Sequence, residues 1–432
     1  MACMQVQEKS TGSIFESVDF LHKRHKYYLY FTYCTVRFYI CTIQSCQINF
    51  AEEIFLEKRK LFRLIFFAVT ALAMVAMIIF GTTTDINLGR NPLRGAEFPR
   101  GRVLGVVSDQ TTQDGALRGG MQMLEVEILS GEHRGRVVHV RNIMFIDAPI
   151  NPQIGQTLII HFDCHGDGNY TASVHSYQRE TAIYLIAVLF LVLIVAVGGK
   201  AGLSSAYGLV FTFVTLLFLL IPAIVRGGQP AFLTILVSIL VTAVSLISIM
   251  GFEKKTWVSI AGTLVGIAFY CLFYVIIARA VRVTGFNIPE MNQLIGLSFT
   301  SISNLTQLLF CGILIASLGA VMDTSVSVAS ATAELASSNN DITFKPLWKS
   351  SMRMARDCVG SSANTLILAF TGTFFVTLIM FQAIDMNYTM LINRIDIAVE
   401  VLRAISASAG MLLCAPATAL LGSYAYTAKA KK

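Results

Sequence analysis

The sequence predicts an all-α polytopic membrane protein of about eight transmembrane helices, with a small extracytoplasmic β-barrel-like domain after the first helix. Two observations predict this fold class. Of the 432 residues, 55% are hydrophobic and 14% are charged, whereas soluble domains contain roughly 25% charged residues. The apolar residues also form long uncharged runs, separated in one place by a stretch in which polar and apolar residues alternate.

Charge and motif content narrow the class of function. The net charge of +7 comes from short basic clusters beside apolar runs, which is the positive-inside pattern, so the lipid bilayer and not nucleic acid is the expected partner. The nine cysteines include no C-x-x-C pair, and neither a disulfide framework nor a zinc ribbon is indicated. No phosphate-binding loop, HExxH helix or GxSxG elbow occurs, so an enzyme is not expected, nor a cofactor.

The N-terminal part divides into an extension and a first span. Residues 1–57 are rich in Cys, Tyr and Phe without a clear period, and they are interpreted as a poorly ordered extension; a weak span within 27–46 is the alternative. The first transmembrane helix is predicted at 58–81, with the uncharged core Leu64–Phe80. This core is at the lower end of the roughly 17 to 25 residues that a span requires. Basic residues from Lys58 to Arg63 precede it and predict a cytoplasmic N-terminus.

Residues 82–180 alternate with the period of strands and are predicted to form the extracytoplasmic β domain. The segment LEVEILSGEHRGRVVHVRN at 124–142 is typical of a hairpin, and five strands suit a small barrel of the OB or SH3-like kind. The predicted strands are Arg102–Val107, Leu124–Leu129, Arg136–Val140, Thr157–Phe162 and Tyr170–His175.

One part of this domain contains metal-ligand residue types. His161, Asp163, His165 and Asp167 alternate, and Cys164 lies among them. The segment lacks the bidentate Glu of a calcium loop, and such residues are common in any polar hairpin. We therefore favour the hairpin and expect no metal site.

Residues 181–428 are predicted to form a seven-helix transmembrane domain. Lys200, the pair at 254–255, the segment 345–356 and the basic tail 429–432 supply nearly all the lysines of this half, which predicts a multi-pass protein of the cell membrane with both termini cytoplasmic. The uncharged runs are Ala182–Gly199, Ala201–Val225, Gly227–Phe252, Thr256–Ala278, Met291–Met322, Cys358–Ile384 and Ala404–Ala428.

Two features of these runs predict irregular helices. Pro222 and Pro416 interrupt or end spans, because proline removes a backbone donor that lipid cannot replace. Met291–Met322 is too long for one straight crossing and polar in its first half, so either a re-entrant segment or a loop followed by one tilted helix is expected.

Two helices carry polar residues close to the hydrocarbon. Asp323 follows the run 291–322, and helical spacing places Ser327 and Glu334 on its face. Arg356 and Asp357 precede the next run, where Asn364 continues the face of Asp357. Charges at membrane depth are costly and usually functional, so these six residues are a candidate transport or gating site. The alternative is that the charges anchor helix ends and that the small residues serve close packing.

Two motifs resemble a known family. LGAVMDTSVSVASATAEL at Leu318–Leu335 and RDCVGSSANTLILAF at Arg356–Phe370 are similar to the GAVMD helix and the arginine-aspartate helix of the YibE/F-like family of bacterial multi-pass membrane proteins. Ala355 departs from the glycine that the family usually has there.

Three further segments fit the same resemblance, which extends over about Leu64–Tyr426. They are the hairpin Leu124–Gly135, LIPAIVRGG at Leu220–Gly228 and APATA at Ala415–Ala419. The resemblance implies the architecture and no particular activity.

The leading hypothesis is a secondary permease or channel-like transporter of a small solute or ion, in which Asp323 and Asp357 bind a cation or proton and Arg356 sets their charge state. The alternative is a non-transporting sensor or assembly factor that acts through the β domain. A homo-oligomer or a partner membrane protein is compatible with either hypothesis.

Overall fold

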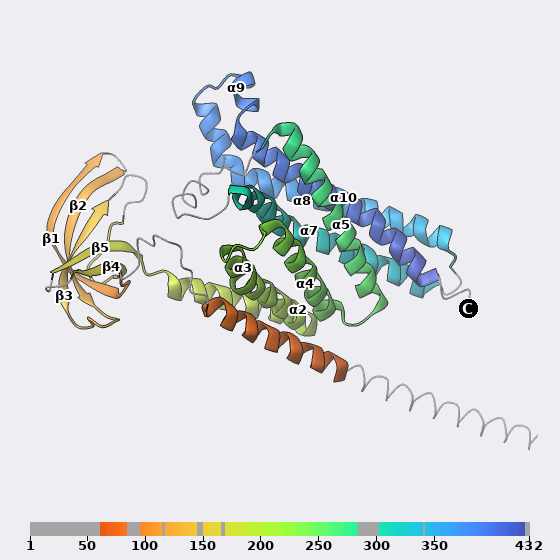
Figure 1. Ribbon diagram of the computed structural model, residues 1–432, viewed down its shortest axis with the longest axis horizontal. Coiled ribbons are helices and arrows are strands. Elements are labelled where there is room, and N and C mark those ends of the chain that lie inside the picture. The colour runs from red at the N-terminus through yellow and green to blue at the C-terminus, as the bar shows by residue number, and fades with distance from the viewer. Residues whose placement is uncertain are drawn as a thin grey trace, which may run out of the picture. The chain divides into compact units, whose positions relative to one another are not determined.

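The computed structural model describes residues 61–83, 96–114, 117–144, 150–165, 169–283, 302–339 and 342–427. The predicted extension and the basic tail lie outside these residues. The chain divides into two units, Met1–Ala73 and Met74–Lys432, and the described part of the first is the beginning of the helix Leu61–Thr82. This helix coincides with the predicted first span. The later elements, which Figure 1 labels, all belong to the second unit.

Five strands follow the first helix, as the alternating stretch predicts. They are β1 Arg100–Asp114, β2 Leu117–Ile128, β3 Val137–Met144, β4 Thr157–His165 and β5 Asn169–Tyr177. Every second side chain of β3 is buried because successive residues of a strand point to opposite faces, and the inward side chains of all five strands form one apolar core. The hairpin is confirmed, with Leu124 opposite Val140 and Val126 opposite Val138.

The strand order is β1-β2-β3-β5-β4, and β4 pairs back onto β1. Only a few residue pairs close the sheet into a barrel. Three residue pairs join β1 to β4, and a single parallel bridge from Arg141 to Ser173 joins β3 to β5. The predicted β domain is therefore confirmed as a five-stranded sheet, while the closure expected of a small barrel is marginal.

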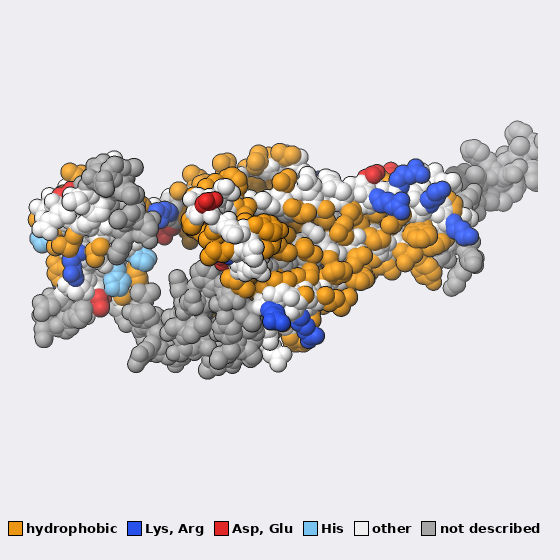
Figure 2. All heavy atoms as spheres, turned by 90° about the horizontal axis from the view of Figure 1, so that it is seen from above, with side chains coloured by type: hydrophobic (Ala, Val, Ile, Leu, Met, Phe, Trp, Pro, Cys, Tyr) orange, Lys and Arg blue, Asp and Glu red, His pale blue; other side chains and the backbone are white. Residues whose placement is uncertain are grey.

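Seven helices in the described part of the chain are long and apolar enough to cross a membrane. Figure 2 shows hydrophobic side chains over most of the helical surface and Lys and Arg in separate clusters, one of them at one end, which is consistent with a multi-pass membrane protein. The helices are Leu61–Thr82, α2 Glu180–Thr215 with its continuation through η1 Leu216–Leu220 into α3 Ile221–Val225, α4 Pro230–Met250, α5 Lys254–Val281, α7 Ile302–Ser338, α8 Phe344–Ala383 and α10 Ile395–Thr427. The short α9 Tyr388–Ile392 links α8 to α10.

The difference between eight predicted spans and seven helices arises at Gly199. This residue interrupts α2 with φ 55° and ψ −130°, a conformation that glycine adopts readily. A Cβ on Gly202 would collide with the carbonyl oxygen of Ile194, although eight residues of straight helix would separate these positions by about 12 Å. The chain therefore folds back at Gly199, and the predicted spans 182–199 and 201–225 correspond to the two arms.

Two helices begin or end differently from the prediction. The candidate span in α7 is Gln307–Ser338, so Asp323 lies near its middle and not after its end. Residues 284–301 lie outside the described part, and a re-entrant segment there stays a prediction.

α10 begins at Ile395 and continues through Pro416, because burial of the residues around the proline holds the helix together despite the missing donor. A prediction from uncharged runs alone misplaces the ends of both helices, because a charged side chain does not end a helix.

The helices α5, α7 and α10 pack closely along a packed seam, which we define as Ser259, Thr263, Gly266, Val321, Ser325, Gly410 and Cys414. A Cβ on Gly266 would lie 2.6 Å from Cγ1 of Val321 and 2.9 Å from Cβ of Cys414. The hydroxyl of Ser325 is 2.7 Å from the hydroxyls of both Ser259 and Thr263. Small residues and hydroxyl pairs thus join the centre of the bundle, as is typical of membrane helices.

Candidate functional site

The exposed face of α7 carries the first three predicted site residues. Asp323, Ser327 and Glu334 are all exposed. They share this face with small residues nearer the start of the helix, and neither Gly312 nor Gly319 has an atom within 4 Å of a Cβ built on it. Asp323 and Glu334 have no ion-pair partner among the described residues. The three side chains thus lie on one exposed side of α7, and their role in transport or gating stays a prediction.

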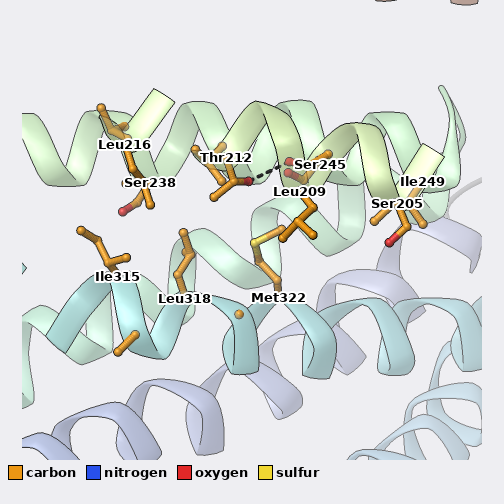
Figure 3. A pocket seen from close by; sticks show the side chains of 15 residues that line it. Ser205, Leu209, Thr212, Leu216, Ser238, Ser245, Ile249, Ile315, Leu318 and Met322 are labelled. Carbon is orange, nitrogen blue, oxygen red and sulfur yellow. Dashed lines mark hydrogen bonds between the residues drawn. The ribbon is translucent and has the colours of Figure 1, made fainter. Parts of the chain in front are cut away.

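A pocket of about 350 Å³ lies beside this face, between α2, α4 and α7. Figure 3 shows α7 side chains, among them Leu318 and Met322, pointing across it toward α2 and α4. The wall is mainly apolar but includes four hydroxyl residues, Ser205, Thr212, Ser238 and Ser245.

The hydroxyls of the pocket differ in their hydrogen bonds. Thr212 donates to the carbonyl of Gly208 at 2.8 Å, the bond drawn in Figure 3. No hydrogen bond within the described residues uses the side chains of Ser205, Ser238 or Ser245. These hydroxyls are therefore available to a molecule in the pocket.

Asp323 belongs to the helix face that lines the pocket. Ala316 and Gly319 are lining residues, and Asp323 follows them by seven and four residues, which places all three on one side of α7. Met322, the residue before Asp323, also lines the pocket. The carboxylate is thus positioned about one helical turn beyond the pocket wall, near mid-span, where an isolated charge is most costly.

The predicted residues of α8 occupy a separate surface. Arg356, Asp357 and Asn364 are exposed, whereas Ala355 and Leu366 are buried in clusters with α7 and α10 side chains. Two residues correspond to about 200° of rotation, so Asp357 and Asn364 point away from the packed side. No contact among the described residues joins Asp357 or Asn364 to Asp323, so the contacts do not bring the site residues of α7 and α8 together.

The predicted role of Arg356 has no support in the contacts. Arg356 and Asp357 have no ion-pair partner among the described residues. Successive residues of a helix do not face each other, so these two side chains diverge. Among the described residues, Arg356 therefore forms an ion pair with neither Asp323 nor Asp357.

One charged pair in α10 was missed by the sequence reasoning. Glu400 and Arg403 form an ion pair with 3.1 Å between Oε2 and Nη1, and the other carboxylate oxygen of Glu400 is buried without a hydrogen-bond partner. The predicted span began at Ala404 and left this pair in a loop. The spacing of Asp396, Glu400 and Arg403, at i, i+4 and i+7, could have revealed a helix with one charged face.

The metal-ligand residue types of the β domain do not converge within the described residues, and Asp167 lies outside them. Among the described residues, no group of three or more His, Cys, Asp or Glu side chains could hold a metal ion. Cys164 instead has its Sγ 3.4 Å from Nε2 of His133, and the ring of His161 contacts Phe98.

The YibE/F-like protein family matches residues 186–428, which is more than half of the chain. The chain belongs to the YibE/F-like family. The match begins within α2 and ends with α10, so it includes the pocket and both resemblance motifs, while the hairpin 124–135 lies outside it. No curated protein and no solved structure matches this chain.

Proposed function

We propose that this YibE/F-like protein is a multi-pass membrane transporter of a small solute or ion. Its binding site is the pocket between α2, α4 and α7, together with Asp323. The observation that carries the proposal is a hydroxyl-lined pocket beside a mid-span carboxylate. The volume is at the lower end of ligand sites, and apolar walls with few polar groups are typical of them. Polar groups at this depth usually mark a substrate or ion pathway.

The chemistry of the pocket suits a cation or a small polar solute. Three uncommitted hydroxyls can donate or accept hydrogen bonds, and the carboxylate of Asp323 supplies a negative charge or a proton acceptor. On binding, the substrate would lose water molecules and contact these hydroxyls and the carboxylate instead.

Flux measurements on the purified protein in proteoliposomes test the proposal. The probes are sodium uptake, rubidium uptake and an entrapped pH dye, followed by a panel of small neutral solutes. Gly319→Leu adds a side chain at a lining position where a Cβ meets no atom within 4 Å, and it should reduce flux at least tenfold. Asp323→Asn should abolish flux of any cation. Gly312→Leu is the matched control, because it adds the same side chain to the same helix at an equally open position outside the pocket.

Equal flux through the wild type and Gly319→Leu would contradict this site. Absence of flux for every probe with correctly inserted protein would favour the sensor or assembly alternative. In that case, deletion of residues 82–178 should abolish the cellular role, whereas transport by the helices would survive it.

Topology can be tested independently by labelling single cysteines in intact cells with an impermeant thiol reagent. Gln110→Cys in β1 should be labelled from outside, because the basic flank of the first helix predicts a cytoplasmic N-terminus. Lys200→Cys should be protected, because with a cytoplasmic N-terminus the first arm of α2 would cross inward and end at the fold-back at Gly199. Labelling at position 200 would show that α2 does not cross twice.

A further inference from the structure

We propose that two copies of this chain form a two-fold dimer through one side of α8. This side, called here the α8 polar face, consists of Arg353, Asp357, Asn364 and Thr371. The inference rests on the proposed membrane insertion and is independent of transport.

Spacing places these residues on one line. Asp357, Asn364 and Thr371 are separated by seven residues each, and Arg353 precedes Asp357 by four. A repeat of seven keeps side chains at the contact line of two helices that cross at about 20°. Gly360 lies between Asp357 and Asn364, at the second contact position of the same heptad.

No other part of the described chain covers this face. All four residues are exposed, and a Cβ on Gly360 would have nothing within 4 Å. The side of α8 that packs against α7 and α10 is the opposite one, with Ala355, Leu366 and Phe370. Only 11% of the most apolar window of α8 is buried, compared with 56% in α4, α7 and α10.

Three of the four polar side chains of the face also lack partners among the described residues. Thr371 donates to the carbonyl of Ile367 at 2.8 Å, and the neighbouring Thr365 donates to Ser361 at 3.1 Å, so these hydroxyls are satisfied within their own helix. The side-chain amide of Asn364 has no hydrogen bond, and Arg353 and Asp357 have no ion pair, among the described residues. Leaving an unpaired amide in hydrocarbon is unfavourable, and Asn364 lies within the uncharged run Cys358–Ile384.

A second copy fits this face better than an unrelated helix because the face is complementary to itself. An interface with two-fold symmetry brings the same patch together from both partners. With the axis along the membrane normal, Asn364 meets its counterpart at the same depth, and an amide both donates and accepts. Arg353 and Asp357, one turn apart, can pair reciprocally between the copies, and Gly360 permits close approach.

The experiment measures association of the full chain in lipid vesicles by energy transfer between two fluorescent labels over a dilution series. Asn364→Leu should weaken dimerisation about tenfold, the loss expected for one or two interhelical hydrogen bonds. Thr365→Val is the matched control, because it removes an exposed hydroxyl that is already satisfied, and its association should equal that of the wild type.

A second measurement identifies the occupant of the face. Thr371→Cys should form a cross-linked homodimer in native membranes, whereas Ala369→Cys, about 200° away on the helix, should not. A wild type that stays monomeric at all densities would overturn the proposal, as would an Asn364→Leu variant that associates normally. A Thr371→Cys product that contains a different protein would also overturn it. Because no substrate is involved, failure here is distinguishable from failure of the transport proposal.

Discussion

The packed seam and the α8 polar face have similar compositions but opposite environments. In the seam, a Cβ on Gly266 would contact both neighbouring helices, and a Cβ on Gly410 would lie 3.0 Å from the carbonyl of Gly266. On the face, Gly360 has open space around it. The seam hydroxyl of Ser325 bonds two side chains of α5, whereas the amide of Asn364 forms no hydrogen bond within the described part of the chain. Small and polar residues on a membrane helix therefore indicate that another helix packs there. Only the fold shows whether that helix belongs to the same chain.

The largest effect on stability is expected at Gly266, where α5 packs closely against α7 and α10 in the packed seam. Gly266→Leu should destabilise the protein by about 3 kcal/mol, the upper end for overpacking, because a side chain there meets Val321, Cys414 and the backbone of Gly410. Gly312→Leu, on the open side of α7, should stay folded. Thermal unfolding and monodispersity of both variants in detergent check the contrast. Similar behaviour of the two would mean that α5 and α10 are not packed this closely.

An intermediate effect is expected from the hydroxyl cluster of the seam. Ser325→Ala should reduce the free energy of unfolding by about 1 to 2 kcal/mol, since it leaves buried hydroxyls with fewer partners. Ser327→Ala is the matched control, because Ser327 is exposed on the same helix and should change stability by less than about 0.5 kcal/mol. Denaturant titrations provide the measurement, and equal values would show that the cross-helix bonds add little.

The sequence predicts the secondary structure better than it predicts which polar residues meet. Alternation locates all five strands, because one side of each strand is buried. Uncharged runs locate the helices but not their ends, so Asp323 was placed outside its span and Glu400 in a loop. The fold-back in α2 depends on the backbone angles of a single residue, Gly199, which the pattern of uncharged runs does not reveal. The separation of Asp323 from Asp357 depends on how α7 and α8 are rotated in the bundle, which periodicity within each helix does not determine.

The smallest expected effect distinguishes the two roles considered for Arg356. A desolvated ion pair would make Arg356→Gln cost roughly 3 to 5 kcal/mol, and a second neutralisation at its partner would restore folding. The structure gives this exposed guanidinium no ion-pair partner among the described residues, and it lies about 80° of helical rotation from Asn364. We therefore expect Arg356→Gln to change the free energy of unfolding by at most a few tenths of a kcal/mol.

Two double variants extend this test by combining Arg356→Gln with Asp357→Asn or with Asp323→Asn. Each should unfold like the single variant that carries the same aspartate substitution. Unfolding of the single and double variants in detergent checks this expectation. A poorly folded Arg356→Gln that either second substitution rescues would show that the charges are paired in the folded protein, and the rescuing residue would identify the partner.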